Sequence, residues 1–128
     1  MIVLSIIAAD TQANAVAALL SGGYLRFYDG TQPADADAPI SSQRLLAELR
    51  FGTPAFGPAS AGEITAKPIS KTEAVATGKA TWFRFLVNDG TTTVMDGSVG
   101  IAECDLSLND CRIQQGAELT VSNFCFTV

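Results

Sequence analysis

The sequence contains no histidine. Ser-His-Asp and Cys-His catalytic arrangements both need an imidazole to activate the nucleophile, so neither can be assembled from this chain. Aspartates recur from Asp29 to Asp110, but most stand in turn-like segments, where hydrogen bonds to the nearby backbone explain them better than a glycosidase pair does. Phosphate-binding sequences of the GxxxxGK(S/T) and GxGxxG types are also missing. We therefore predict that the protein is not an enzyme and takes no cofactor.

Charged residues are scarce, at 16% of the chain against the usual quarter or so. A small monomer normally spreads more charge over its surface, so this composition favours a protein that is partly covered by partners. The eight basic residues are scattered from Arg26 to Arg112 without clustering, and the formal net charge is −5. Because such a field repels a phosphate backbone, we predict no binding to nucleic acid.

Cysteine is also rare. The three cysteines, Cys104, Cys111 and Cys125, cannot all pair within one chain. We predict free, largely buried thiols in a reducing cytosol, with a Cys104–Cys111 disulfide as the alternative. Three thiolates without a CxxC spacing and without histidine are a poor metal signal, so we predict no metal site from them.

Long apolar runs are missing except for a short one near the start. The run from Ile2 to Ala9 is far too short to cross a bilayer and lacks the basic residues that open a signal peptide. We therefore predict mature sequence here and no membrane contact. The β-prone side chains of this run would aggregate if exposed, so we expect the protein's own domain or a partner to cover them. They are Ile2, Val3, Leu4, Ile6 and Ile7.

A single short helix is predicted after this strip. Asp10 or Thr11 can cap it, apolar residues recur at i, i+3, i+4 and i+7 from Ala13 to Leu20, and Gly22-Gly23 ends it. The helix can be a lid on one end of a β structure or an arm that docks on a neighbouring subunit. We assign residues 1–22 to an amino-terminal arm with this helix and residues 23–128 to one β domain.

The sequence is rich in β patterns, most clearly in a hairpin from Ala80 to Gly100. Apolar and mixed positions alternate on its first arm, Asn88-Asp89-Gly90 supplies the turn, and β-branched residues run back from Thr91. A lone tryptophan in a strand is usually a packing residue, with a carbohydrate-stacking platform as the alternative. The predicted core-packing residues are Trp82, Phe83, Phe85, Phe124 and Phe126.

Further strands are predicted between turn signals. Leu45–Phe51 also contains good helix formers, but its strict alternation favours a strand. The apolar phase changes between Ala117 and Val128, which predicts a bulge near Ser122-Asn123. The other predicted strands are Tyr24–Tyr28, Glu63–Ile69, Val99–Ala102 after a turn at Asp96-Gly97, and Asp105–Leu108. About eight short strands predict an all-β fold, an antiparallel β-sandwich or jelly roll with a short amino-terminal helix.

A polar connection from Thr31 to Ser42 follows the first of these strands. Its two prolines, two aspartates and several small residues predict a loop. Asp29, Asp35 and Asp37 lack the glycine and the terminal glutamate of an EF-hand loop, so we predict no calcium site.

Four segments together resemble a family of small proteins encoded by tailed bacteriophages and prophages. They are YLRFYDGTQPADADAPIS, LLAELRFGTPAFGPAS, ATGKATWFRFLVNDGTTTVMDGSVG and DLSLND…GAELTVSNFCFTV. The resemblance covers nearly the whole chain from about Tyr24 onward.

The resemblance implies a structural protein of the virion, made in the bacterial host cytoplasm and present in many copies. The favoured form of this hypothesis is a capsid decoration, or cement, protein on the outside of the major capsid protein lattice. Its partners would be the major capsid protein and further copies of itself. The alternative is a tail-associated or fibre-tip protein that binds a host surface glycan, and a third reading is an accessory enzyme acting on cell-wall glycan.

Under the cement hypothesis, the expected contacts are open sheet edges, the Ile2–Leu20 arm and the Thr31–Ser42 loop, through strand addition or apolar docking. Each contact can be modest, because binding two capsomers at once raises the effective concentration for the second contact. The candidate interaction residues of the loop are Pro33, Asp35, Asp37 and Pro39.

Overall fold

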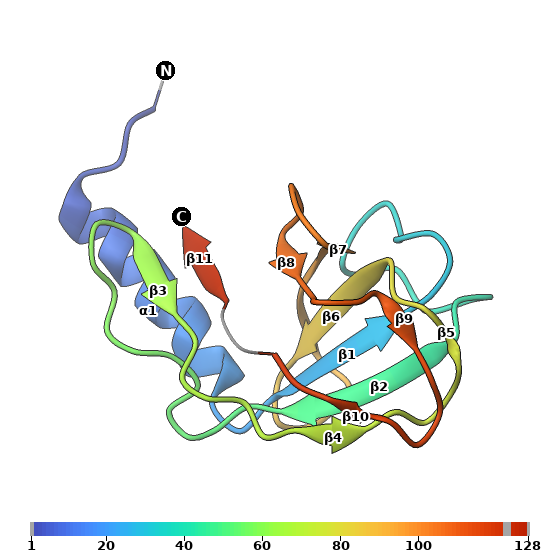
Figure 1. Ribbon diagram of the computed structural model, residues 1–128. Coiled ribbons are helices and arrows are strands. Elements are labelled where there is room, and N and C mark those ends of the chain that lie inside the picture. The colour runs from blue at the N-terminus through green and yellow to red at the C-terminus, as the bar shows by residue number, and fades with distance from the viewer. Residues whose placement is uncertain (1, 122–123, 128) are drawn as a thin grey trace.

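The structure, a computed structural model, describes residues 2–121 and 124–127. Within them the chain is mostly β, with one short amino-terminal helix and a curled, largely antiparallel sheet, as predicted at this level (Figure 1). In chain order the elements are α1 (Ile6–Leu20), β1 (Tyr24–Tyr28), β2 (Leu45–Arg50), β3 (Glu63–Thr65), β4 (Thr72–Glu73), β5 (Gly78–Lys79), β6 (Trp82–Leu86), β7 (Thr93–Gly100), β8 (Leu106–Ser107), β9 (Arg112–Ile113), β10 (Glu118–Leu119) and β11 (Cys125–Thr127).

The largest sheet has five strands in the order β2-β1-β6-β7-β8. Its first three pairings are antiparallel and the last, between β7 and β8, is parallel. The other described strands form two-stranded antiparallel ladders, β10-β4, β11-β3 and β5-β9. A sandwich or jelly roll of about eight strands is not confirmed, because the strands are divided among one sheet and several small ladders.

The predicted hairpin is formed by β6 and β7, which pair from Trp82 opposite Ser98 to Leu86 opposite Thr93. The predicted turn at Asp96-Gly97 is wrong, since both residues lie inside β7. Gly97 is needed there because the Phe83 ring occupies the space that a Cβ would fill.

Two of the other predicted strands form, and a third is shorter than predicted. Tyr24–Tyr28 and the strand beginning at Leu45 form as predicted, whereas the strand from Glu63 ends at Thr65. Beyond it, Ala66 still donates its N–H to the Phe124 carbonyl and forms an isolated bridge with Phe56, but Pro68 has no N–H with which to continue a strand. The bulge expected near Ser122-Asn123 lies outside the described residues.

The helix begins four residues earlier than the predicted cap at Asp10. Ser5 has an extended backbone and its Oγ accepts the Ala8 N–H at 3.2 Å, which makes Ser5 the N-cap. Ile6 and Ile7, predicted to belong to a β-prone strip, therefore form the first turn of α1. The Ser5 cap overrides their β preference because it satisfies a backbone donor that would otherwise lack a partner.

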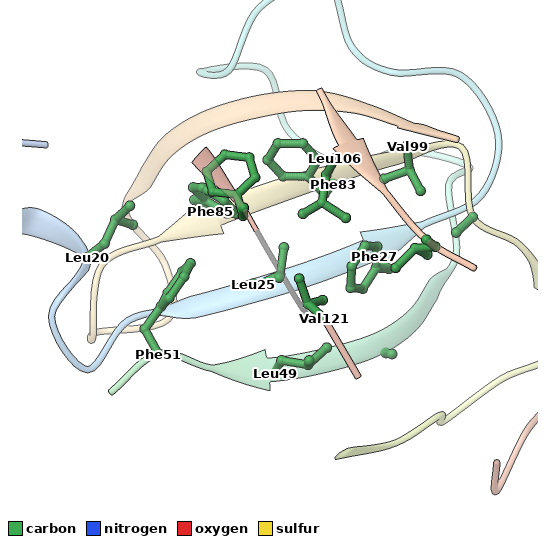
Figure 2. Packing of buried hydrophobic residues seen from close by; sticks show 14 of the residues in the cluster. Leu20, Leu25, Phe27, Leu49, Phe51, Phe83, Phe85, Val99, Leu106 and Val121 are labelled. Carbon is green, nitrogen blue, oxygen red and sulfur yellow. The ribbon is translucent and has the colours of Figure 1, made fainter. Parts of the chain in front are cut away.

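The core lies on one face of the five-stranded sheet. Phe83 and Phe85 of β6 are buried there, and the Phe124 ring contacts both, with centroid distances of 6.0 and 5.2 Å. Phe51 meets Phe85 edge to face at 5.1 Å. Figure 2 shows these rings from β6 beside apolar side chains of β1 and β2 on the same face. Phe126 is only partly buried and packs against this cluster.

Candidate interaction surfaces

The outer face of the sheet carries a row of charges that runs across four strands. The backbone register places Glu48 opposite Arg26, Arg26 opposite Arg84, and Arg84 opposite Asp96. Two arginines directly opposite each other would repel, but each one binds an acid on its other side. The Arg26 Nε lies 2.6 Å from a Glu48 carboxylate oxygen, and the Arg84 Nε lies 2.7 Å from Asp96. The four charges of the row therefore cancel, and each one is paired within the row.

Arg84 also holds the Thr31–Ser42 loop onto this face. Its Nη2 donates to Asp96 and to the Ala38 carbonyl, both at 2.9 Å. The hydrogen bonds to Asp96 raise the pKa of the Arg84 guanidinium above its ordinary value, although burial opposes them. The side chains of Arg84 and Asp96 are both buried, at 6% and 4% exposure. The Arg84 charge is therefore paired inside the protein and is not accessible to a ligand.

Trp82 lies beside Arg84 under the start of the same loop. It is fully buried, it stacks on Tyr28 at a centroid distance of 4.7 Å, and its Nε1–H donates to the Asp29 carbonyl at 3.0 Å. A carbohydrate platform needs an exposed ring face. The glycan-stacking alternative for Trp82 is therefore wrong, and its ring packs outside the main core cluster, on the opposite face of the sheet from Phe83.

The loop exposes its acidic side chains while its backbone is held at several points. Asp35 Oδ1 accepts the Asp37 N–H at 3.0 Å, and both of these aspartates are exposed. Pro33 is half-buried and Pro39 is exposed. The Gln43 side chain closes the base of the loop by donating to the Thr31 carbonyl at 2.6 Å. The loop thus presents two carboxylates and a proline from a supported backbone.

The predicted apolar strip is exposed, so the protein's own domain does not cover it. Relative exposures are 92% for Ile2, 77% for Val3, 43% for Leu4, 68% for Ile6 and 80% for Ile7. Residues 2–4 form no strand, and Figure 1 shows this segment projecting away from the body of the molecule. Five exposed apolar side chains of this size, interrupted only by the Ser5 cap, make this segment a candidate interaction surface.

Helix α1 turns its anchoring polar groups inward. Asp10 Oδ1 accepts the Gly62 N–H at 2.6 Å, and Asn14 Oδ1 accepts the Ala59 N–H at 3.0 Å, so both side chains fix the helix to the protein. The Thr11 hydroxyl is turned back to the Ile7 carbonyl at 2.8 Å. The outward residues form what we call the α1 stripe, namely Ile7, Ala8, Thr11, Ala15, Ala18 and Leu19.

The α1 stripe was missed by the sequence pattern. The i, i+3, i+4, i+7 spacing found the inner side of the helix, where Ala13 and Leu20 are buried. It gave no reason to examine the other side, where Leu19 is 52% exposed. The available signal was the shortage of charge, because Asp10 is the one charged side chain between Ile2 and Gly23. A helix that is apolar on all sides is normally covered on all sides.

The structure does not bring the two groups of candidate residues together. In Figure 1 the amino-terminal segment and the loop from Thr31 to Ser42, drawn in cyan, lie on opposite sides of the molecule. The five-stranded sheet separates them. They are two different surfaces, one apolar and one acidic.

The three cysteines differ in their surroundings and form no disulfide. Cys111 is buried, Cys104 is half-buried, and Cys125 is exposed, so the expectation of largely buried thiols fails for Cys125. Burial raises the pKa of the Cys111 thiol. A thiol with a raised pKa is a weak nucleophile at neutral pH.

Within residues 2–121 and 124–127, no cluster of three or more cysteine or acidic side chains could hold a metal ion. None of the helices described there has the length and apolar character needed to cross a membrane. No family model, no curated protein and no solved structure matches this chain.

Proposed function

We propose that this protein is a structural protein of a tailed-phage virion, and in particular a capsid decoration protein that stabilises the major capsid protein lattice from outside. The observation that carries the proposal is the pair of separate exposed surfaces on opposite sides of one firmly packed domain (Figure 1). A module with two contact surfaces can bridge neighbouring subunits, and the first contact raises the effective concentration for the second.

The charge distribution supports a position outside the shell. The net charge is −5, and the arginines at the centre of the sheet are neutralised by Glu48 and Asp96. A protein of this charge is repelled by packaged DNA. The exposed Asp35 and Asp37 give the Thr31–Ser42 loop an acidic tip that suits a basic patch on a capsid protein.

The packing supports a rigid spacer. Ile64 of β3 is fully buried and Phe124, next to β11, contacts the rings of β6. We infer that the short ladders form the second layer of an incomplete β-sandwich. Such a domain keeps its two surfaces at a fixed separation. The buried position of Trp82 supports this function over glycan binding by a tail protein.

The test is binding of the purified protein to empty capsids of the phage that encodes it. We expect binding in a fixed ratio to the major capsid protein and a higher melting temperature of the capsid. Asp35→Lys/Asp37→Lys should weaken capsid binding at least tenfold, and Glu73→Lys/Glu103→Lys, which makes the same change in charge at two exposed acids elsewhere, serves as the control for charge alone. If the protein ignores capsids but binds host cells or glycans, the proposal is wrong. If the protein degrades peptidoglycan, the hypothesis of an accessory enzyme acting on cell-wall glycan replaces the proposal.

A further inference from the structure

The α1 stripe is open to solvent in a single chain, with Ala8 half-buried and its other members exposed, although every side chain in it except Thr11 is apolar. We propose that it packs against the same stripe of a second copy, with the two helices antiparallel and related by a two-fold axis. This inference concerns how two copies pair, and it stands whether or not the protein decorates a capsid.

The sizes of the side chains along the stripe match such a pairing. A helix rises 1.5 Å and turns 100° per residue, and an antiparallel partner centred on the middle of α1 reverses the order of contacts. Ile7 of one copy then lies opposite Ala18 of the other, and Leu19 lies opposite Ala8. Large side chains meet small ones at both ends of the contact. A two-fold interface requires this self-complementarity.

The centre of the stripe allows the two helices to approach closely. Thr11 and Ala15 meet there, and both are small. Because the Thr11 hydroxyl already donates to the Ile7 carbonyl, Thr11 turns no unsatisfied donor towards the partner. Small residues at a helix crossing permit a short interaxial distance and dense packing.

Charge also favours a second copy over an unrelated acidic or basic partner. The stripe carries no charged side chain, and nearby Asp10 is bound to the Gly62 N–H on the inner side. Two molecules that each carry a net charge of −5 can therefore meet here without placing carboxylates against each other. The stripe therefore offers no charged group with which an acidic or basic partner could pair.

The amino-terminal segment extends the same interface. In the antiparallel arrangement, residues 2–4 of one copy pass the carboxyl end of the other copy's α1. The protein has a shallow hollow there, lined by Ala17, Ala18, Ser21, Pro54 and Phe56 among others. Ile2, Val3 and Leu4 are apolar side chains that can fill it.

The exposed apolar area is large enough for a stable dimer. A standard interface buries about 800 Å² on each partner. Five large apolar side chains lie on the arm and the α1 stripe of each copy, and three of them are more than two-thirds exposed. Together with the small side chains of the stripe, their exposed area is of the order that a standard interface buries. The five are Ile2, Val3, Leu4, Ile7 and Leu19.

The experiment is sedimentation equilibrium of the full chain and of two matched variants. Ala15→Glu puts a charge at the centre of the stripe, whereas Gln32→Glu puts the same charge on the exposed Thr31–Ser42 loop, on the other side of the molecule. We expect a dimer for the unchanged protein and for Gln32→Glu, and a dissociation constant at least tenfold weaker for Ala15→Glu. Thermal melting followed by circular dichroism verifies that both variants fold.

Crosslinking tests the antiparallel order directly. In a Cys125→Ser background, which removes the exposed thiol, a mixture of Ile7→Cys and Ala18→Cys chains should form an oxidised heterodimer, and a mixture of Ile7→Cys and Gln12→Cys chains should not. A monomeric unchanged protein, or equal association of both glutamate variants, would overturn the inference. If the protein is monomeric yet Ala15→Glu abolishes capsid binding, the stripe binds the shell and only the dimer is wrong.

Discussion

The two faces of the central sheet are built from alternate residues of the same strands but are stabilised in opposite ways. On the inner face, Phe83 and Phe85 pack among apolar side chains and need no partners for hydrogen bonding. On the outer face, Arg84 is equally buried and depends on Asp96 and on the Ala38 carbonyl. The inner face tolerates changes of shape poorly, whereas the outer face tolerates loss of a partner poorly.

The two kinds of stabilisation meet at β6. Both of its faces are covered, so all five of its residues are buried and neither of its faces is open to a ligand. The two candidate surfaces lie on opposite sides of the molecule, at the amino-terminal segment with α1 and at the Thr31–Ser42 loop (Figure 1). The sheet thus acts as the support that separates these two surfaces.

The largest loss of stability should come from removing a buried aromatic ring from the inner face. Phe85 is fully buried and touches three other rings, and a Phe→Ala change at such a site costs about 3–5 kcal/mol. Phe126→Ala is the matched control, since Phe126 is only partly buried and its loss should cost about 1 kcal/mol. Urea unfolding measures both free energies. Equal losses would show that the core does not centre on β6.

The stability of the fold should be almost as sensitive to loss of one member of the Arg84–Asp96 pair on the outer face. Asp96→Ala leaves the buried Arg84 charge without its acid, which costs about 3 kcal/mol. The double variant Arg84→Met/Asp96→Leu removes both charges and should recover most of that loss. Proteolysis within the Thr31–Ser42 loop should become faster in both variants, because the bond to the Ala38 carbonyl is weakened or lost. Unchanged proteolysis would contradict the anchoring role of Arg84.

The sequence predicted the inner face far better than the outer one. Alternation at Phe83 and Phe85, with the Asn88-Asp89-Gly90 turn, is local information and it located the hairpin. The covering of Trp82 and Arg84 depends on the loop folding back from residues far away in the chain, and no local pattern reports that. For the same reason Asp96-Gly97 resembled a turn, although Gly97 is required by the Phe83 ring.

The candidate surfaces were also predicted unevenly. The apolar strip from Ile2 to Ile7 was recognised from composition, but whether the protein's own domain covers it could not be told, and its helical half depends on the Ser5 cap. The α1 stripe could not be found by looking for an apolar face that points to a core, since that search finds the side of Ala13 and Leu20, which is the buried one. Which side of such a helix is covered depends on tertiary contacts.

A smaller effect is expected at the other ion pair of the outer row. The Arg26 Nε lies as close to Glu48 as the Arg84 Nε lies to Asp96, but Arg26 donates one hydrogen bond to its acid whereas Arg84 donates two, and the side chains of Arg26 and Glu48 are 24% and 37% exposed. Solvent screens this pair, so a double-mutant cycle with Arg26→Met and Glu48→Gln should give a coupling of about 1 kcal/mol or less, weaker at 1 M salt. A coupling as large as that of Arg84 and Asp96 would show that burial does not separate the two pairs.

The smallest effect concerns the turn between β6 and β7, which lies beyond both faces. Hydrogen bonds from the Thr92 hydroxyl, then from the backbone N–H groups of Thr92 and Thr91, lower the pKa of Asp89 from 3.8 to about 2. Because the pKa is lowered on folding, the ionised carboxylate stabilises the turn fully above pH 3.8, and this contribution is lost as the pH falls through about 2. An NMR titration of the Asp89 carboxyl measures it.

Thr92→Val removes the hydroxyl that contributes most and should move the Asp89 pKa towards 3.8, whereas Thr91→Val removes only the smallest contribution and should raise the pKa much less. A pKa near 3.8 in the unchanged protein would mean that the turn does not hold its hydrogen bonds in solution. The hairpin would then depend on the packing of Phe83 and Phe85 and on the Arg84–Asp96 pair alone, and the two faces of the sheet would account for all of its stability.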